Sequence, residues 1–130
     1  MNVFIAPTVV TLFTIALLLS CSAYVSFARG RYGIHAPATT GHPQFDVAYR
    51  IQMNTLENAV AFLPALWLCA FYLSAAFAGA IGAIWLAARA WYALAYARDP
   101  QRRGSAYTLS VVALATLAVA GGIGIVRSAL

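Results

Sequence analysis

Charge is scarce in this sequence, and negative charge is the scarcest. Only 8% of the 130 residues are charged, and the three acidic residues are Asp46, Glu57 and Asp99. Because an ordinary soluble domain carries roughly 25% charged residues, the composition excludes a soluble enzyme. Lysine is absent, and no basic run extends beyond the Arg102 and Arg103 pair. Nucleic-acid binding is therefore a poor explanation for the net charge of +5.

Cysteine and targeting signals are also sparse. Cys21 and Cys69 both lie in apolar segments and have no metal-ligand spacing, so we expect buried thiols and no metal site. No Lys or Arg precedes the first apolar run, and this run is longer than the core of a secretory signal. Residues 3–27 are therefore predicted to form a retained first helix.

The long uncharged stretches predict an integral membrane protein. Residues 1–28, 58–88 and 104–126 lack charge, and each stretch can supply the ~20 apolar residues that cross a bilayer as a helix. Residues 28–44 are rich in glycine, proline and polar residues that interrupt helices. A short uncharged turn follows at 74–78, and Pro100 ends the third helix near Asp99. We expect helices over 3–27, 46–73, 79–99 and 105–126. The fold class is all-α, an up-down four-helix membrane bundle that forms one domain over residues 1–130.

Arginine is unevenly distributed between the two predicted membrane faces. One face carries the loop arginines and their neighbours, and the other carries only Arg127. The arginines of the first face are Arg29, Arg31, Arg50, Arg98, Arg102 and Arg103. The positive-inside rule predicts that both polar loops are cytoplasmic and that both termini lie outside.

Polar residues recur at helical spacing inside the second and third predicted helices. Arg50, Asn54 and Glu57 share one face (i, i+4, i+7), and Arg89 begins a second polar stripe that includes Tyr92. At about 1.5 Å per residue, Glu57 lies roughly 10 Å inward of Arg50, and Arg89 reaches a similar depth from the same face. We therefore expect a buried Glu57–Arg89 ion pair, because unpaired charges inside a membrane are costly. The alternative is a structural polar network that holds the helices together, with the tyrosines as interfacial aromatics.

Two motifs in these stripes resemble the MAPEG family, the membrane-associated proteins in eicosanoid and glutathione metabolism. The segment RIQMNTLE over residues 50–57 is similar to the family's RxQxNxxE motif. The segment ARAWYALAYAR over residues 88–98, followed by Arg103, is similar to the family's ARxxYxxxYAR stretch and its later arginine. The order and spacing of both motifs agree.

The resemblance implies a glutathione enzyme of the microsomal glutathione S-transferase type, organised as a homotrimer in contact with membrane lipid. It implies that glutathione, the co-substrate, lies between subunits near the cytoplasmic face. The implied binding residues are Arg29, Arg50, Gln52, Asn54 and Glu57, with Tyr92 and Tyr96 from a neighbouring chain, and the implied catalytic residue is Arg103.

The chemistry of glutathione suits these residue types. Its two carboxylates and one ammonium group match guanidinium forks and one carboxylate, which Arg29, Arg50 and Glu57 supply. A permanently charged Arg103 beside the sulfur favours the thiolate, and each unit of pKa lowering represents about 1.4 kcal/mol.

Two departures from the family pattern narrow the expected activity. Asn58 stands where the leukotriene-forming synthases place a tyrosine, and Gly30 stands where they place a second loop arginine. We therefore favour a general transferase or peroxidase acting in detoxification on hydrophobic electrophiles or lipid hydroperoxides, in a bacterial inner membrane. Two alternatives remain: a non-catalytic, lipid-binding family member, and a small proton-coupled multidrug exporter that uses Glu57.

Overall fold

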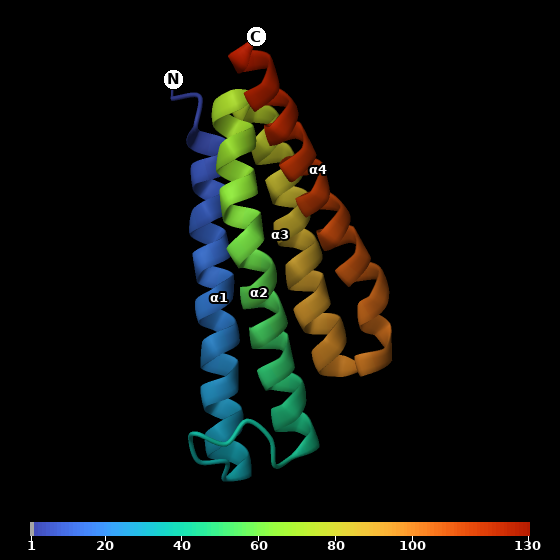
Figure 1. The fold of residues 1–130 in the computed structure, drawn as a ribbon. Coiled ribbons are helices and arrows are strands. Elements are labelled where there is room, and N and C mark those ends of the chain that lie inside the picture. Colours follow the sequence, from blue (N-terminus) through green and yellow to red (C-terminus); the bar gives the residue numbers. More distant parts are fainter. Residues whose placement is uncertain (1) are drawn as a thin grey trace.

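Four long helices make up the computed structural model, which describes residues 2–130 (Figure 1). The helices are α1 (Ile5–Tyr32), α2 (Pro43–Tyr72), α3 (Ala75–Arg98) and α4 (Gly104–Ala129), and a short 3-10 helix, η1 (Pro100–Arg103), precedes α4. Each of the four is long and apolar enough to cross a membrane. The predicted all-α, four-helix membrane fold is confirmed.

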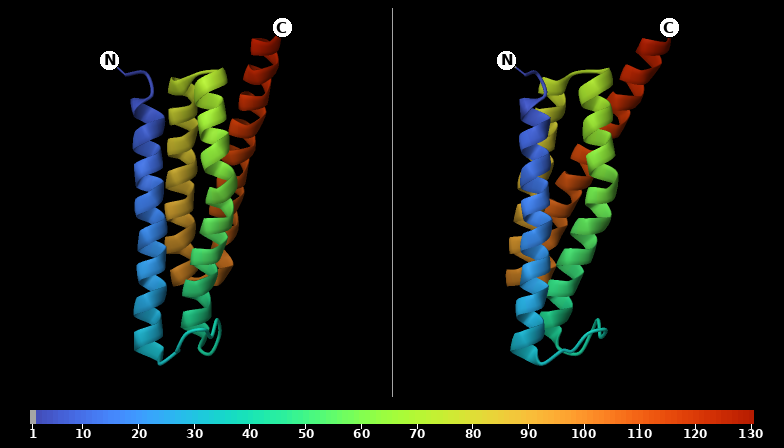
Figure 2. Two further views of the ribbon diagram at one scale, coloured as in Figure 1. Left: turned by 60° about the vertical axis from the view of Figure 1, so that its left-hand side comes forward. Right: turned by 90° about the vertical axis from the view of Figure 1, so that its left-hand side faces the viewer.

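The helices run alternately up and down, with α2 and α3 at the centre of the bundle. Both α2 and α3 pack against α1 and against α4. Both chain termini lie at one end, and the α1–α2 loop and the η1 turn lie at the other (Figures 1 and 2). The last turns of α4 extend beyond the ends of its neighbours (Figure 2). The two polar connections therefore share one end of the bundle.

The boundaries around the first loop differ from those predicted. Helix α1 continues past residue 27 to Tyr32, and it ends at Gly33, which adopts a left-handed conformation (φ 65°) and donates its N–H to the carbonyl of Arg29. Glycine takes this conformation without steric cost. Helix α2 begins at Pro43, earlier than predicted, because the His42 side chain accepts a hydrogen bond from the first turn (3.2 Å) and proline suits a first helical position.

The core of the bundle is built on an aromatic pair between α2 and α3. The rings of Phe62 and Trp85 stack with centroids 3.7 Å apart, and both side chains are fully buried. The Trp85 indole N–H donates to the Asn58 side-chain oxygen at 2.7 Å. The polar atom of this large side chain is thus satisfied inside the bundle.

Helices α2 and α4 pack closely at two glycines. A Cβ atom added at Gly124 would lie 2.6 Å from the backbone of Tyr72, and one added at Gly121 would lie 3.1 Å from the Cys69 backbone nitrogen. Only a residue without a side chain permits this packing distance.

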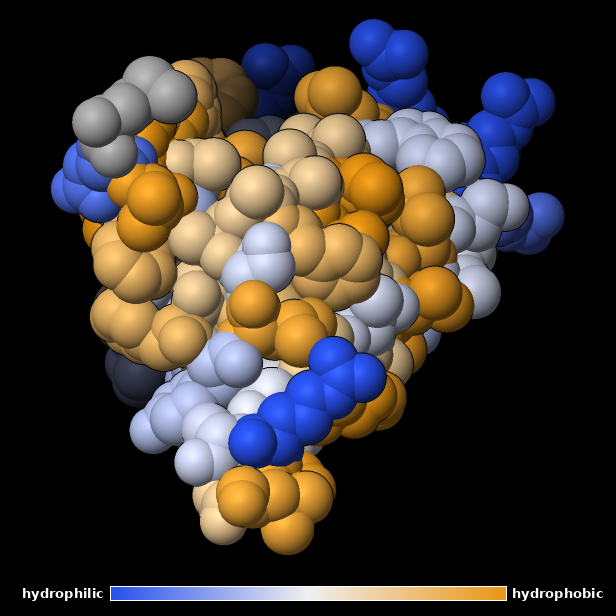
Figure 3. All heavy atoms as spheres, turned by 90° about the horizontal axis from the view of Figure 1, so that it is seen from above, coloured by the Kyte–Doolittle hydropathy of each residue, from blue (hydrophilic) through white to orange (hydrophobic). Residues whose placement is uncertain are grey.

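The outer surface of the bundle is mainly apolar. Seen from the end that carries both termini, hydrophobic residues dominate and hydrophilic ones are scattered (Figure 3). Large apolar side chains such as Phe13, Val60, Leu94 and Val119 are exposed on the sides of the helices. This surface suits contact with lipid chains or with another apolar partner rather than with water.

Candidate functional site

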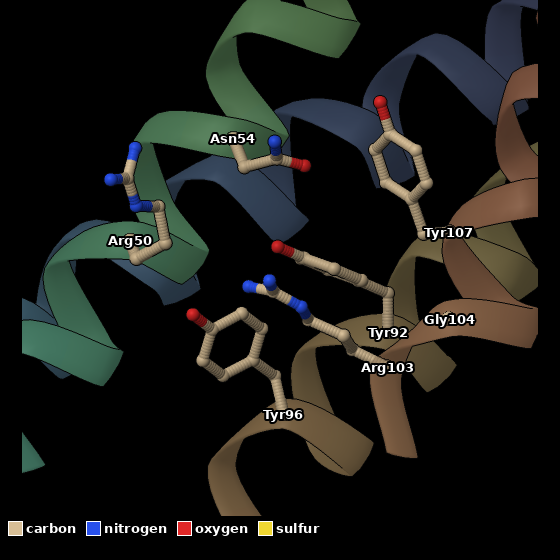
Figure 4. Close-up of a pocket in the computed structure, with 7 residues that line it drawn as sticks. All are labelled: Arg50, Asn54, Tyr92, Tyr96, Arg103, Gly104 and Tyr107. Carbon is tan, nitrogen blue, oxygen red and sulfur yellow. The ribbon is translucent and has the colours of Figure 1, made fainter. Parts of the chain in front are cut away.

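A pocket of about 410 Å³ opens at the end of the bundle that carries the polar connections. It lies between α2 on one side and the α3–η1–α4 turn on the other (Figure 4). Its lining residues are Arg50, Asn54, Tyr92, Tyr96, Arg103, Gly104 and Tyr107. The pocket therefore brings the two sequence motifs together within a single chain.

Helical spacing explains how these side chains reach one cavity. Arg50 and Asn54 are four residues apart on α2, and Tyr92 and Tyr96 are four residues apart on α3, so each pair shares a helix face. The 3-10 turn then reverses the chain and places Arg103 above the α3 tyrosines. In Figure 4 the Arg103 guanidinium lies beside the hydroxyls of Tyr92 and Tyr96 and points toward α2.

Two neighbouring arginines of the turn have different environments. The Arg102 side chain is 83% exposed, and its Nε lies 3.4 Å from an oxygen of Asp99. The same carboxylate caps the turn by accepting the backbone N–H of Gln101 at 3.0 Å. The Arg103 guanidinium instead stacks on the ring of Tyr96, with its carbon 4.6 Å from the centroid. Only Arg103 of this pair faces the pocket.

The pocket is cationic. Arg50 and Arg103 contribute two guanidinium groups, and no acidic side chain lines the cavity within the part of the chain that the structure describes. Tyrosine hydroxyls and the Asn54 amide supply neutral hydrogen-bonding groups. Such a lining suits a small anionic molecule, because guanidinium forks bind carboxylates and favour a negative charge nearby.

Arg89 lies beneath the pocket and is fully buried. One terminal nitrogen donates to Asn54 Oδ1 at 3.0 Å and to Thr55 Oγ1 at 2.9 Å, and the other donates to Ser110 Oγ at 3.4 Å. Its guanidinium carbon also lies 4.1 Å from the centroid of the Tyr92 ring. Arg89 thus joins α2, α3 and α4 under the pocket floor.

The predicted Glu57–Arg89 ion pair is wrong. Glu57 is exposed, and among residues 2–130 the structure contains a single ion pair, Asp99 with Arg102. Hydroxyl and amide oxygens accept hydrogen bonds from the two terminal nitrogens of Arg89 instead. Two residues at a similar depth in the membrane do not meet unless each side chain also points toward the other around its helix.

Three predicted binding residues lie outside the pocket of this chain. Arg29 donates to the carbonyl of Ala38 at 2.8 Å and stacks over Phe45 at 4.8 Å, so it orders the first loop. Gln52 lies about 200° around α2 from Arg50, at 100° per residue. Glu57 lies on the Arg50 face, two turns deeper.

Tyr92 and Tyr96 line one pocket together with Arg50 and Asn54 of their own chain. The resemblance implied that a neighbouring chain supplies these tyrosines to glutathione, and this stays a prediction. Tyr107 is a lining residue that the sequence reasoning missed. Its position, four residues after Arg103 in a helix that begins at Gly104, is the spacing from which it could have been found.

The two departures from the family pattern have different structural settings. Asn58 accepts the Trp85 indole N–H inside the bundle and does not line the pocket. Gly30 lies on α1, where an added Cβ would meet no atom within 4 Å. Asn58 is therefore part of the packing inside the bundle, whereas a side chain at position 30 would meet no neighbouring atom at its Cβ.

Fold and site together define a small polytopic membrane protein with a cationic pocket at the end that carries its polar connections. Comparison with known proteins specifies the class further. The MAPEG family model matches residues 7–123, and the chain belongs to the MAPEG family.

Relatives in this family include both bacterial and animal proteins. A Synechocystis protein described as uncharacterized is 37% identical over 113 residues, which cover 87% of this chain and 82% of the relative. Microsomal glutathione S-transferase 2 of Bos taurus is 33% identical over 80% of this chain and 71% of its own length. Leukotriene C4 synthase of Bos taurus is 34% identical over 89% of this chain and 77% of its own length.

Proposed function

We propose that this protein is a membrane-bound glutathione transferase or peroxidase that acts on hydrophobic electrophiles or lipid hydroperoxides. The observation that carries the proposal is the meeting of Arg50, Asn54, Tyr92, Tyr96 and Arg103 in one cationic pocket. The name of one relative, a microsomal glutathione S-transferase, supports glutathione as the co-substrate. A cavity of about 410 Å³ also lies within the usual range for small-molecule sites, about 300–1,000 Å³.

The lining residues divide into binding and activating groups. Arg50 offers its guanidinium fork to a glutathione carboxylate, and the Asn54 amide and tyrosine hydroxyls offer hydrogen bonds to the peptide. Arg103 lines the same pocket, and in this proposal it activates the thiol, because its permanent positive charge favours the thiolate. Because Arg103 is held on the Tyr96 ring, the charge is already in place when glutathione arrives.

The proposed chemistry follows from an ionised sulfur. The thiolate attacks an electrophilic carbon, a sulfur–carbon bond forms, and the leaving group departs with the electron pair. With a hydroperoxide, attack on oxygen breaks the O–O bond and releases an alcohol, and a second glutathione converts the sulfenic acid to disulfide and water. Substrates dissolved in the bilayer can reach a pocket that lies between membrane helices.

We propose that the pocket faces the cytoplasm of a bacterium, from the inner membrane. Six arginines flank the polar connections, whereas Arg127 alone lies near the termini, and the positive-inside rule assigns the richer face to the cytoplasm. This orientation gives the pocket access to the cytoplasmic compartment, where the thiol would be supplied. It leaves both termini outside.

The binding residues that do not line the pocket support contact with a neighbouring subunit, and we propose a homotrimer on the family resemblance. Glu57 is exposed in a span, and a carboxylate facing hydrocarbon costs about 2.5–3.5 kcal/mol on insertion scales. We propose that a neighbouring subunit covers Glu57, which then meets the glutathione ammonium at the edge of the pocket. Gln52 faces the other way, so it and Arg29 would serve a pocket held by an adjacent subunit.

A second candidate function is lipid binding without catalysis, and one observation favours it. An apolar groove of about 400 Å³ lies along α1 and α3 and is lined by residues that include Leu17, Cys21, Ile51 and Leu94. Cys21 and Ile51 belong to the same buried cluster as the pocket residues Tyr92 and Tyr96. A lipid chain in this groove would lie on the other side of the cluster from the cationic pocket.

Purified protein in detergent distinguishes these candidates. We expect ultraviolet absorbance to report a thiolate when glutathione is added, and a generic aromatic electrophile to be conjugated. The Arg103→Ala variant should retain glutathione binding but lose turnover. Absence of both the thiolate signal and conjugation in the folded wild type would overturn the enzymatic proposal and leave the lipid-binding candidate.

A further inference from the structure

Arg89 has an unusual environment for a charged residue in a membrane span. Its side chain is fully buried, and no carboxylate pairs with it among the described residues. The Nε atom has no hydrogen-bond partner. Its remaining contacts are the neutral oxygens of Asn54, Thr55 and Ser110 and the face of Tyr92. Keeping an unpaired cation at such a cost calls for a function beyond packing.

The contacts of Arg89 reach α2, α3 and α4, the three long helices that line the pocket. Asn54 on α2 and Tyr92 on α3 are lining residues that touch Arg89 directly. Ser110 on α4 accepts from Arg89 and donates to the Tyr107 carbonyl at 2.7 Å, and Tyr107 is also a lining residue. One guanidinium is thus connected to three of the groups that form the pocket wall.

The bond to Asn54 fixes the orientation of that amide. A guanidinium has donors and no acceptors, so the Asn54 oxygen must face Arg89 and its NH₂ group is left to face elsewhere. The two N–H groups of the amide are then free to donate hydrogen bonds to ligand oxygens. Without Arg89 the amide could rotate and present its oxygen, which repels a carboxylate.

We propose that Arg89 is a positioning residue for the pocket: it holds Asn54 as a donor and Tyr92 as a fixed wall for the peptide part of glutathione. This inference rests on the proposed function. Arg89 acts through Asn54 and Tyr92, and it does not touch the ligand. It therefore controls the affinity for glutathione, whereas Arg103 controls the ionisation of the sulfur.

The test uses the full-length protein in detergent and measures glutathione affinity by calorimetry together with KM and kcat. Arg89→Met keeps an unbranched, flexible side chain but removes the charge and all hydrogen-bond donors. We expect it to weaken glutathione binding about tenfold, the effect of losing one charge-assisted hydrogen bond, with kcat at saturating glutathione nearly unchanged. Arg89→Lys keeps the charge and a single donor nitrogen in place of the guanidinium fork, and its affinity for glutathione should fall only about threefold. The control is Arg98→Met, an exposed arginine outside the pocket, which should bind as the wild type does.

A double-mutant cycle separates positioning from general packing. Asn54→Leu should weaken binding by itself, and adding Arg89→Met should weaken it little further, because Arg89 acts through that amide. Additive losses would overturn the proposal, as would wild-type affinity in a folded Arg89→Met variant. If Arg89→Met does not fold, the test uses Thr55→Val and Arg89→Lys instead. A wild-type KM for glutathione in both of these variants would overturn the proposal. A folded wild type that binds no glutathione ends the proposed function and this inference together, whereas unchanged affinity in the variants ends this inference alone.

Discussion

The guanidinium of Arg103 rests on the ring of Tyr96, with 4.6 Å between the guanidinium carbon and the ring centroid. Tyr96 in turn meets the edge of Tyr92 at 5.6 Å between centroids. Both tyrosines are buried, whereas Arg103 is exposed at the mouth of the pocket. A flexible arginine in a turn is thus given one orientation by two packed rings.

Replacing Arg103 should affect turnover far more than replacing its neighbour. We expect Arg103→Ala to lower kcat by on the order of 100-fold, the effect typical of removing a group that stabilises developing negative charge. Arg102→Ala is the matched control, because Arg102 pairs with Asp99 outside the pocket. Conjugation kinetics check both variants, and equal activity of the two would contradict the catalytic role of Arg103.

The ring of Tyr96 should matter separately from its hydroxyl. Tyr96→Phe keeps the surface on which Arg103 rests and removes only a hydrogen-bonding group, so it should raise KM for glutathione. Tyr96→Leu removes the ring as well. Its kcat should be roughly threefold to tenfold lower than that of Tyr96→Phe, in line with cation–π energies. Steady-state kinetics of the two variants give the comparison. Identical kcat values would mean that the ring does not position Arg103.

Asn58 should contribute to stability rather than to catalysis. Asn58→Leu leaves the Trp85 indole N–H buried without its partner at 2.7 Å, which we expect to cost about 1–3 kcal/mol of folding free energy. Val60→Ala, at an exposed position of the same helix, should change stability little. Thermal unfolding in detergent measures both. A wild-type melting midpoint for Asn58→Leu would show that this bond contributes nothing.

The close approach of α2 and α4 predicts opposite effects at two nearby glycines. Gly124→Ala brings a methyl group to 2.6 Å from the Tyr72 backbone, and we expect overpacking to destabilise the protein by about 1–3 kcal/mol. At Gly122 an added Cβ meets nothing within 4 Å, so Gly122→Ala should be neutral or stabilising by up to about 1 kcal/mol. The order of the two melting midpoints is the measurement. The reverse order would contradict the observed helix packing.

The proposed orientation can be tested with reporters at the chain ends. We expect a fusion after Leu130 to report a location outside the cytoplasm, and a reporter inserted in the loop near Thr39 to report the cytoplasm. A C-terminal reporter that is active only in the cytoplasm would reverse the orientation. Such a result would not affect the helix packing or the pocket.

The sequence contained enough to predict the fold and much of the candidate site. Apolar length defined four spans, and spacing on the second and third helices placed Arg50 with Asn54 and Tyr92 with Tyr96. The partner of Arg89 could not be predicted in this way. Its neutral partners, including Thr55 and Ser110, carry no charge to mark them, and their position depends on how each helix is rotated in the bundle.

The first loop shows a different limit of sequence reasoning. The glycines and arginines after Ala28 change the composition abruptly, yet α1 continues to Tyr32 and ends at Gly33. Arginines in a last turn interact favourably with the helix dipole, so a change in composition there does not mark the end of the helix. Tyr107 was missed because a single tyrosine in an apolar helix has no pattern until the turn before it is known.

Both chain ends lie at the far end of the bundle from the pocket. An affinity tag at either end, or attachment to a bead or a sensor chip through it, therefore leaves the entrance unobstructed. The protein can be captured from either terminus for ligand measurements without shielding the residues being studied.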